Sequence, residues 1–418
     1  MSDKEVHNDL LPHLFRQEYA KMTAVLCRHF GLHDIEIAED IANDTFLKAS
    51  EYWAINGVPE NPTAWLYTVA KNKTKDYFKH RDIFESRIKK EIKSDMPEAE
   101  HEFEYSDELI ADSQLAMIFA VCNPANSQES QICLALQILC GFSIEEIANA
   151  FLIPAETVKK RLHRARTLLR NNSFQISGLT ESQIKSRLEA VLKILYLLFN
   201  EGYFSKSGNK QIKTDLCSEA ARLTLFLTEN PITNTAQTNA LLALMCFQSS
   251  RLEARAGVNG ESILFNEQDK SLWDQSLIQR GNYYLVHATA NSASSPTKYH
   301  LEAAIAYWHT TETVTKWTNI LQLYDQLILM ESSPIAVLNR IFAFAQVYGK
   351  DKAILEAKEH KLIKNSYYEA LMGYLHTPTD IDKSMAHYRQ AIKLTKSLIE
   401  KQMLQKEVER LALSNSQH

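Results

Sequence analysis

Residues 143–170 read SIEEIANAFLIPAETVKKRLHRARTLLR, and this stretch decides the fold. Ser143 and Glu146 form a capping box after the turn residue Gly141, which starts one short helix. Pro154 starts the next helix, because its missing N–H is harmless in a first turn. The stretch therefore predicts two helices joined by a tight turn, a helix-turn-helix.

The second of these helices carries two parallel stripes of side chains. Val158, Leu162, Ala165 and Leu169 form an apolar stripe, and Lys159, His163, Arg166 and Arg170 form a basic stripe beside it. Such a helix can enter the major groove of DNA, with early residues at base edges and later ones on phosphates. We predict that DNA is bound by Thr157, Lys159, Lys160, His163 and Arg164. A solvated basic helix of a bundle is the alternative interpretation.

The rest of the chain is also expected to be helical. Gly occurs only 11 times and Pro 10 times in 418 residues, whereas Leu, Ala, Glu, Lys and Ile are frequent. This composition favours helix over sheet. The chain is also too long to fold around one ordinary hydrophobic core. An all-α protein is predicted, with two small helical domains and a larger C-terminal one. The predicted limits are 1–94, an acidic linker at 95–114, 115–172 and 178–418.

The charges of the chain are segregated, although the net charge is only -5. Residues 154–170 hold six Lys and Arg against the single acid Glu156, whereas residues 95–112 hold eight acids and neither Lys nor Arg. The distribution of charge is more informative than the sum about a nucleic-acid partner. A basic DNA-binding segment is therefore compatible with an acidic chain.

An acidic stripe is predicted on a helix from about Ile35 to Trp53. Its members are Glu36, Glu39, Asp40, Asn43 and Asp44, and the residues expected to face inward behind it are Ala38, Ile41, Ala42 and Phe46. A charged stripe of this kind is usually a solvated face. Like charges four residues apart weaken an isolated helix by a few tenths of a kcal/mol, so a basic partner would relieve a cost.

A third pattern begins at Asn61, which caps a helix that Pro62 opens. Basic residues repeat along this helix at four-residue spacing, and aromatic residues are interleaved with them. The basic residues are Lys71, Lys75 and Lys79, and the aromatic residues are Trp65, Tyr67, Tyr77 and Phe78. Cations that hold phosphate beside aromatic rings suit unpaired nucleotides, because a ring replaces the stacking that a flipped base loses. Aromatic residues at this spacing are also common in helix cores.

Taken together and in this order, the three patterns resemble the extracytoplasmic-function (ECF) type of RNA polymerase sigma factors of the sigma-70 class. The matching segments are 38–49 for the polymerase-clamp helix, 61–72 for the promoter-melting helix and 157–166 for the minus-35 recognition helix. The resemblance covers about residues 8–172. It implies a protein that brings core RNA polymerase to promoters, opens the DNA by trapping unpaired bases and catalyses no reaction itself.

The resemblance also implies roles for individual residues. Asp40, Asn43, Asp44, Phe46 and Lys48 would contact the clamp of the largest polymerase subunit, and the flap of the second subunit would be a further contact. Asn61, Trp65, Lys71, Lys75 and Lys79 would act at the minus-ten element. Asn43 departs from the pattern, since many members carry Gln there.

The C-terminal part resembles the subgroup of these sigma factors that carries a tetratricopeptide-like extension. The matching segments are 199–203, 240–245, 251–255, 269–274 and 333–340. Within 371–391, the packing positions of a tetratricopeptide repeat are met by Leu371, Leu375, Ser384, Tyr388 and Ala391, whereas Met372 stands where the repeat has a small residue. An irregular bundle is the alternative. The resemblance implies that the extension regulates the sigma domains, with a protein or small molecule as its unidentified regulator.

Two other functional classes are compatible with parts of the sequence. A ligand-responsive helix-turn-helix regulator would need neither the acidic stripe nor the Trp-Lys helix. An enzymatic extension is suggested by Glu201, Arg251, Glu253, Arg255 and Asp269, although buried salt bridges and polar anchors explain such charges more simply.

Location and cofactors follow from what the sequence contains. The N-terminus has no apolar signal region, and no apolar run approaches the roughly 20 residues needed to cross a bilayer, so a cytoplasmic protein is expected. The six cysteines are scattered without a C-x-x-C pair, as in reduced core thiols. We expect no metal, no cofactor and no membrane partner.

Overall fold

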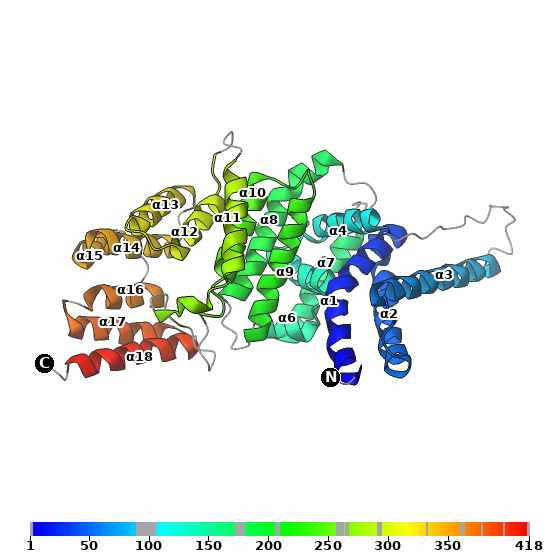
Figure 1. Cartoon of the computed structure of the whole chain (residues 1–418), viewed down its shortest axis with the longest axis horizontal. Helices are drawn as coiled ribbons and strands as arrows, with labels where there is room; N and C mark the ends of the chain where they lie inside the picture. The colour runs from blue at the N-terminus through cyan, green and yellow to red at the C-terminus, as the bar shows by residue number, and fades with distance from the viewer. Residues whose placement is uncertain are drawn as a thin grey trace. The chain divides into compact units, whose positions relative to one another are not determined.

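Helices form all the regular structure in the described part of this chain, and no strand occurs there, as the composition predicts. The computed structural model describes residues 3–88, 106–151, 153–171, 180–204, 210–255, 263, 267–290, 295–331, 333–359, 364–377, 379–395 and 398–415. The chain divides into two compact units, Met1–Ile194 and Leu195–His418 (Figure 1). Helix α8, Glu181–Tyr203, crosses the division.

In its described residues, the first unit is built from α-helices of 7 to 28 residues and two short helical turns. They are α1 Asp3–Phe30, the 3₁₀ turn η1 Leu32–Asp34, α2 Ile35–Asn56, α3 Pro62–Ile88, α4 Asp107–Val121, α5 Gln128–Leu134, the π-helical turn η3 Ala135–Leu139, α6 Ile144–Phe151 and α7 Ala155–Asn171. Gly31 and Gly57 end α1 and α2 with positive φ angles of 86° and 80°. Glycine has no Cβ and adopts this region without steric cost, so both helices stop cleanly.

Helix α1 lies at the centre of the first unit. Its residues from Met22 to Cys27 are completely removed from solvent, because α2, α3, α4 and η3 pack around it. Since α1 precedes the acidic segment and α4 follows it, the two small helical regions share one core. Residues 95–105 of the predicted linker lie outside the described residues, and α4 already begins at Asp107, capped by Ser106.

The second unit consists of consecutive helices. They are α9 Lys210–Glu229, α10 Ala236–Ser249, the 3₁₀ turn η5 Lys270–Leu272, α11 Gln275–Thr289, α12 Lys298–Thr310, α13 Lys316–Met330, α14 Pro334–Tyr348, α15 Lys350–Glu359, α16 Ser366–His376, α17 Ile381–Leu394 and α18 Leu398–Asn415. Neighbours in sequence pack together along this series, α10 on α11, α12 on α13 and α14 on α15. Figure 1 shows α16, α17 and α18 side by side.

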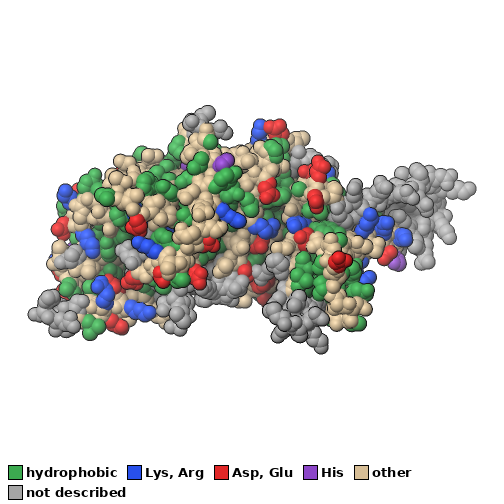
Figure 2. Space-filling view, viewed as in Figure 1, with side chains coloured by type: hydrophobic (Ala, Val, Ile, Leu, Met, Phe, Trp, Pro, Cys, Tyr) green, Lys and Arg blue, Asp and Glu red, His purple; other side chains and the backbone are tan. Residues whose placement is uncertain are grey.

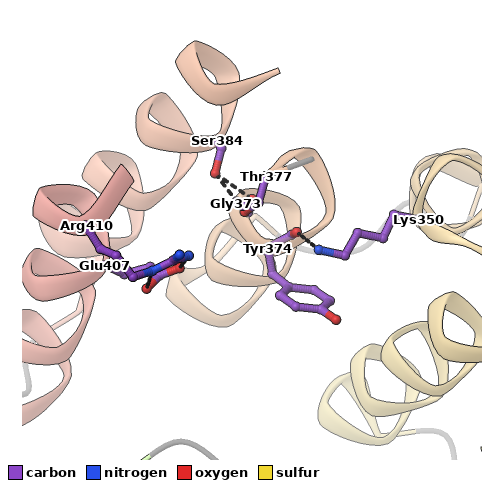
Figure 3. Close-up of polar contacts among 7 residues, drawn as sticks. All are labelled: Lys350, Gly373, Tyr374, Thr377, Ser384, Glu407 and Arg410. Atoms are coloured by element: carbon purple, nitrogen blue, oxygen red, sulfur yellow. Dashed lines mark hydrogen bonds and ion pairs between the residues drawn. The ribbon is translucent and has the colours of Figure 1, made fainter. Parts of the chain in front are cut away.

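The hairpin of α16 and α17 contains the segment that the sequence singled out as a repeat. The positions that the repeat packs, namely Leu371, Leu375, Ser384, Tyr388 and Ala391, are all buried. Gly373 permits the close approach of the two helices, because a Cβ there would lie 3.0 Å from the ring of Tyr388. The hydroxyl of Ser384 donates to the Gly373 carbonyl at 2.8 Å (Figure 3). Small residues thus set the spacing of the hairpin.

No helix in the described part of the chain is both long enough and apolar enough to cross a membrane.

Candidate functional site

The acidic stripe of α2 is divided between two environments. Asp40, Asn43 and Asp44 are exposed, and so is Lys48 one turn further on. Lys73 of α3 approaches the outer end of the stripe, with its Nζ 3.2 Å from an oxygen of Asp44. Glu39, in contrast, is only 8% exposed. The stripe is therefore exposed at Asp40, Asn43 and Asp44, whereas Glu39 is buried.

Helix α7 covers the beginning of the stripe. The guanidinium of Arg166 donates two hydrogen bonds to the carboxylate of Glu39, at 2.6 and 2.7 Å, and a third to the side-chain oxygen of Gln137 at 2.9 Å. Burial would lower the pKa of Arg166, but the hydrogen bonds and charge of Glu39 outweigh burial and raise it. Arg170 lies 3.5 Å from Glu36 in a more exposed pair. Arg166 and Arg170 of the same chain therefore supply part of the basic partner expected for the acidic stripe.

Phe46 is buried, whereas its neighbour Leu47 is exposed. Phe46, for which the family resemblance implies a contact with polymerase, is 5% exposed. Its ring packs edge-on against the ring of Phe15, with 5.0 Å between the centroids. In this conformation its side chain belongs to the core, as the apolar periodicity of α2 predicts. Leu47 is 59% exposed and lies one turn after Asn43 and Asp44, on the same face of α2. Leu47 continues the spacing of the acidic stripe, which is the sequence signal for its exposure.

Asn61 caps α3 as predicted. Its side-chain oxygen accepts a hydrogen bond from the backbone N–H of Ala64 at 3.0 Å, and the residue itself is exposed. Lys75 and Lys79 are also exposed, whereas Lys71 is half-buried. Figure 2 shows a group of basic side chains over α3, and the described Lys or Arg side chains of this helix are all lysines. This helix therefore presents a cationic surface.

Only part of the aromatic series on α3 is placed to meet a ligand. Trp65 is half-buried and stacks on the exposed ring of Tyr52, with 5.5 Å between centroids. Tyr77 and Phe78 instead pack against Phe30 of α1, at 5.4 and 5.1 Å. The Tyr52–Trp65 pair is therefore the part of the aromatic series that reaches the surface, and no sequence pattern on α3 indicated Tyr52 of α2.

The helix-turn-helix has the geometry that its sequence predicts. The N–H of Ser143 donates to Glu146 at 2.8 Å, and the N–H of Glu146 donates back to Ser143 at 3.2 Å. Helices α6 and α7 follow with Pro154 between them. The stripe Val158, Leu162, Ala165 and Leu169 is buried.

The predicted DNA contacts lie along the outer face of α7. Lys159, Lys160, His163 and Arg164 are exposed, and Thr157 is half-buried. Arg166 and Arg170 of the same helix turn toward α2 instead. The basic residues of α7 are therefore divided, with one group open to a polyanion and the other engaged with the acidic stripe.

Metal ligation has no structural counterpart in the described residues, where no group of three His, Cys, Asp or Glu side chains could hold an ion. All six cysteines are buried and free of disulfides. Burial raises the pKa of the Cys122 and Cys246 thiols to about 12, so both carry a proton at neutral pH.

Family comparisons agree with the order of these surfaces along the chain. A model of sigma-70 region 2 matches residues 14–83, which contain α2 and most of α3. A model of sigma-70 region 4 matches residues 127–169, which contain the helix-turn-helix. A third model, described as a family of unknown function (DUF6596), matches residues 187–289. No solved structure matches the chain.

Two curated proteins are similar to this chain. An uncharacterized protein, R00370, of Rhizobium meliloti (strain 1021) is 31% identical over 360 residues, which cover 84% of this chain and 83% of the relative, so the two belong to one family. The RNA polymerase sigma factor YlaC of Bacillus subtilis (strain 168) is 29% identical over 173 residues, covering 40% of this chain and 93% of that protein. With region 2 followed by region 4, the chain belongs to the sigma-70 family of sigma factors, which bind core RNA polymerase and promoter DNA and initiate transcription.

Proposed function

We propose that this protein is an ECF-type alternative sigma factor whose tetratricopeptide-like C-terminal extension modulates its activity. The proposal rests on two exposed surfaces, an acidic face on region 2 and a basic face on region 4. Both lie at the residues that the family motifs assign. A ligand-responsive helix-turn-helix regulator would have no use for the acidic face. Binding to polymerase therefore separates the two functions.

The polymerase contact is proposed to lie on the open part of α2. Asp40, Asn43, Asp44 and Lys48 would meet basic and polar residues of the clamp, with Leu47 as the apolar anchor at the centre of the patch. We expect Asp40→Arg to abolish capture of core polymerase in a pulldown. Glu108→Arg, an exposed charge reversal on α4, should leave capture unchanged. Equal capture by Asp40→Arg and the unmodified protein would contradict this assignment.

Promoter contacts are proposed for two sets of residues. On α3, Asn61, Trp65, Lys71, Lys75 and Lys79 would hold the opened minus-ten strand, with Tyr52 and Trp65 as stacking rings. On α7, Thr157, Lys159, Lys160, His163 and Arg164 would read the minus-35 element in the major groove. Footprinting of the holoenzyme on a cognate promoter tests both, since variants of each set should lose protection at their own element.

Regions 2 and 4 are proposed to separate before the promoter is bound. The minus-35 and minus-ten positions are 25 base pairs apart, which is about 85 Å of duplex. A compact body of about 170 residues is only about 40 Å across. Arg166 and Glu39 join the two regions directly, so this arrangement cannot reach both elements. We propose that it is the closed form and that polymerase binding opens it.

The extension is proposed to set the balance between these forms or to control access to polymerase. Supporting this role, it comprises more than half of the chain, and the 360 residues shared with the Rhizobium relative are too many to lie in the sigma regions alone. Transcription by full-length protein should be compared with a version truncated after Asn172. An active truncation beside a silent full-length protein would identify an inhibitor, and the reverse would identify a required activator. Equal activity would contradict modulation.

A further inference from the structure

A single carboxyl group links α12 to α8, the helix that crosses the division between the two units. Glu302 of α12 is half-buried, and its Oε1 accepts a hydrogen bond from the hydroxyl of Tyr196 in α8 at 3.1 Å. No other hydrogen bond to Glu302 occurs within the described part of the chain. A phenol donates one hydrogen bond but carries no positive charge. The carboxyl group is therefore partly removed from water without a cation bonded to it.

The lysine one turn before Glu302 on α12 is paired with a different acid. The Nζ of Lys298 lies 3.1 Å from a carboxylate oxygen of Glu331, which follows the end of α13. The same Nζ lies 4.9 Å from the centroid of the Tyr196 ring, whose hydroxyl contacts Glu302. Because side chains four residues apart on a helix are neighbours, Lys298 is placed to turn from one carboxylate to the other.

The surroundings of this contact are apolar and aromatic. Ala303 of α12 packs with Phe247 of α10 in a buried cluster, and the side chain of Tyr196 lies against that cluster. The rings of Tyr196 and Tyr299 have 5.5 Å between their centroids, and Tyr299 is only 6% exposed. Surroundings of this kind disfavour the charged form of an acid, because they replace the water that would hydrate it.

The proton affinity of Glu302 reflects these surroundings. Burial raises its pKa to about 7, and the charge of Glu331 adds to the increase. The hydrogen bond from Tyr196 and the charge of Lys298 oppose the increase without cancelling it. From α13, Tyr324 also faces this charge, since burial and then the charge of Glu302 raise the pKa of Tyr324 to about 12. A carboxyl group with these neighbours changes its charge near neutral pH.

We propose that the contact between Tyr196 and Glu302 is a pH-sensitive link between α8 and α12, closed while Glu302 is protonated and opened more often once Glu302 is ionised. An ionised Glu302 gains hydration when the contact opens, and Lys298 then turns toward it from Glu331. Opening therefore increases as pH rises from about 4.5 to about 7 and levels off above that. An effect on transcription rests on the modulatory role proposed for the extension, whereas the pH response of the link does not.

Hydrogen–deuterium exchange of the full-length protein measures this opening. Rates at about pH 5.5 and about pH 7.5 are each divided by the rate of an unprotected amide at that pH, so that only the opening remains. Since Glu302 has a pKa of about 7 in the closed link and 4.5 when released, the open fraction should be about 20-fold lower at the lower pH. The difference should appear in peptides from 195–203 and from α12, whereas peptides from α16 and α17 should keep their protection.

Substitutions identify the group that titrates. Glu302→Gln keeps the shape but cannot ionise, so its protection at both pH values should equal that of the unmodified protein at the lower one. Tyr196→Phe removes a hydrogen bond that favours the ionised form, so the pH response should persist at full size or increase. Glu359→Gln is the matched control, because Glu359 is an exposed carboxylate on α15 of the same unit and its loss should leave the response unchanged.

Equal protection of α8 and α12 at the two pH values in the unmodified protein would overturn the proposal, and this readout needs no variant to fold. A folded Glu302→Gln protein that keeps as large a pH response as the Glu359→Gln control would overturn it as well. Exchange that follows pH beside transcription that does not would support the link and count against modulation by the extension. The two proposals can thus fail separately.

Discussion

The contact between Arg166 and Glu39 should control whether regions 2 and 4 stay together. Arg166→Met removes the two hydrogen bonds to Glu39 and the one to Gln137. Glu39 is then left as a carboxylate that is only 8% exposed. Removing one partner of a buried ion pair costs about 3–5 kcal/mol, because the other charge stays buried without compensation. The closed arrangement should therefore be weakened by at least about 10²-fold.

Hydrogen–deuterium exchange of the full-length protein measures this change. Peptides from α2 and α7 should exchange at least about 10²-fold faster in Arg166→Met, while peptides from the second unit keep their rates. Arg170→Met is the control on the same helix, since its pair with Glu36 is more exposed and worth at most about 1 kcal/mol. A double variant, Glu39→Met with Arg166→Met, leaves no unpaired charge and should recover part of the protection.

Equal exchange rates in Arg166→Met and Arg170→Met would refute this reasoning. The closed arrangement would then depend on the apolar core around α1 alone. Failure of the double variant to recover any protection would show that hydrogen bonding to Gln137, rather than an unpaired charge, carries the effect.

Three further predictions follow from the structure. Lys159→Gln should reduce the dependence of holoenzyme–promoter affinity on salt by about one unit of log–log slope, measured by filter binding, and an unchanged slope would exclude a phosphate contact. Gly281→Ala should destabilise the second unit by about 1–3 kcal/mol in thermal denaturation, because the new Cβ would lie 2.7 Å from the ring of Phe247. Burial raises the pKa of Glu302 from 4.5 to about 7. Stability should therefore fall by on the order of 2–3 kcal/mol as pH rises between these values, and Glu302→Gln should abolish this loss in urea titrations.

Much of the helix-turn-helix could be predicted because its determinants are local. The capping box of Ser143 and Glu146, the helix start at Pro154 and the apolar stripe through Val158 and Leu162 each depend on residues within a few turns. Local signals of this kind fix helix ends and the buried face. The same local signals led to the prediction that the exposed residues Lys159 and Lys160 bind DNA.

The partners of each face could not be predicted in the same way. Periodicity placed Glu39 among exposed acids, yet Arg166 buries it from 127 residues away, and no local pattern encodes that distance. Similarly, the spacing of aromatic residues on α3 does not predict that Trp65 packs against Tyr52 while Tyr77 packs against Phe30. Such pairings depend on how helices pack, which a single sequence does not specify.

The pairing of Arg166 with Glu39 also predicts how this family can vary. A neutral residue at only one of the two positions leaves a buried charge without compensation, so such a change should be strongly disfavoured in a working protein. Joint replacement by two apolar residues, or reversal of both charges, avoids that penalty. Across aligned relatives, positions 39 and 166 should therefore change together, whereas the exposed positions 36 and 170 should drift independently. Covariation at this one pair would reveal which relatives retain this contact between regions 2 and 4.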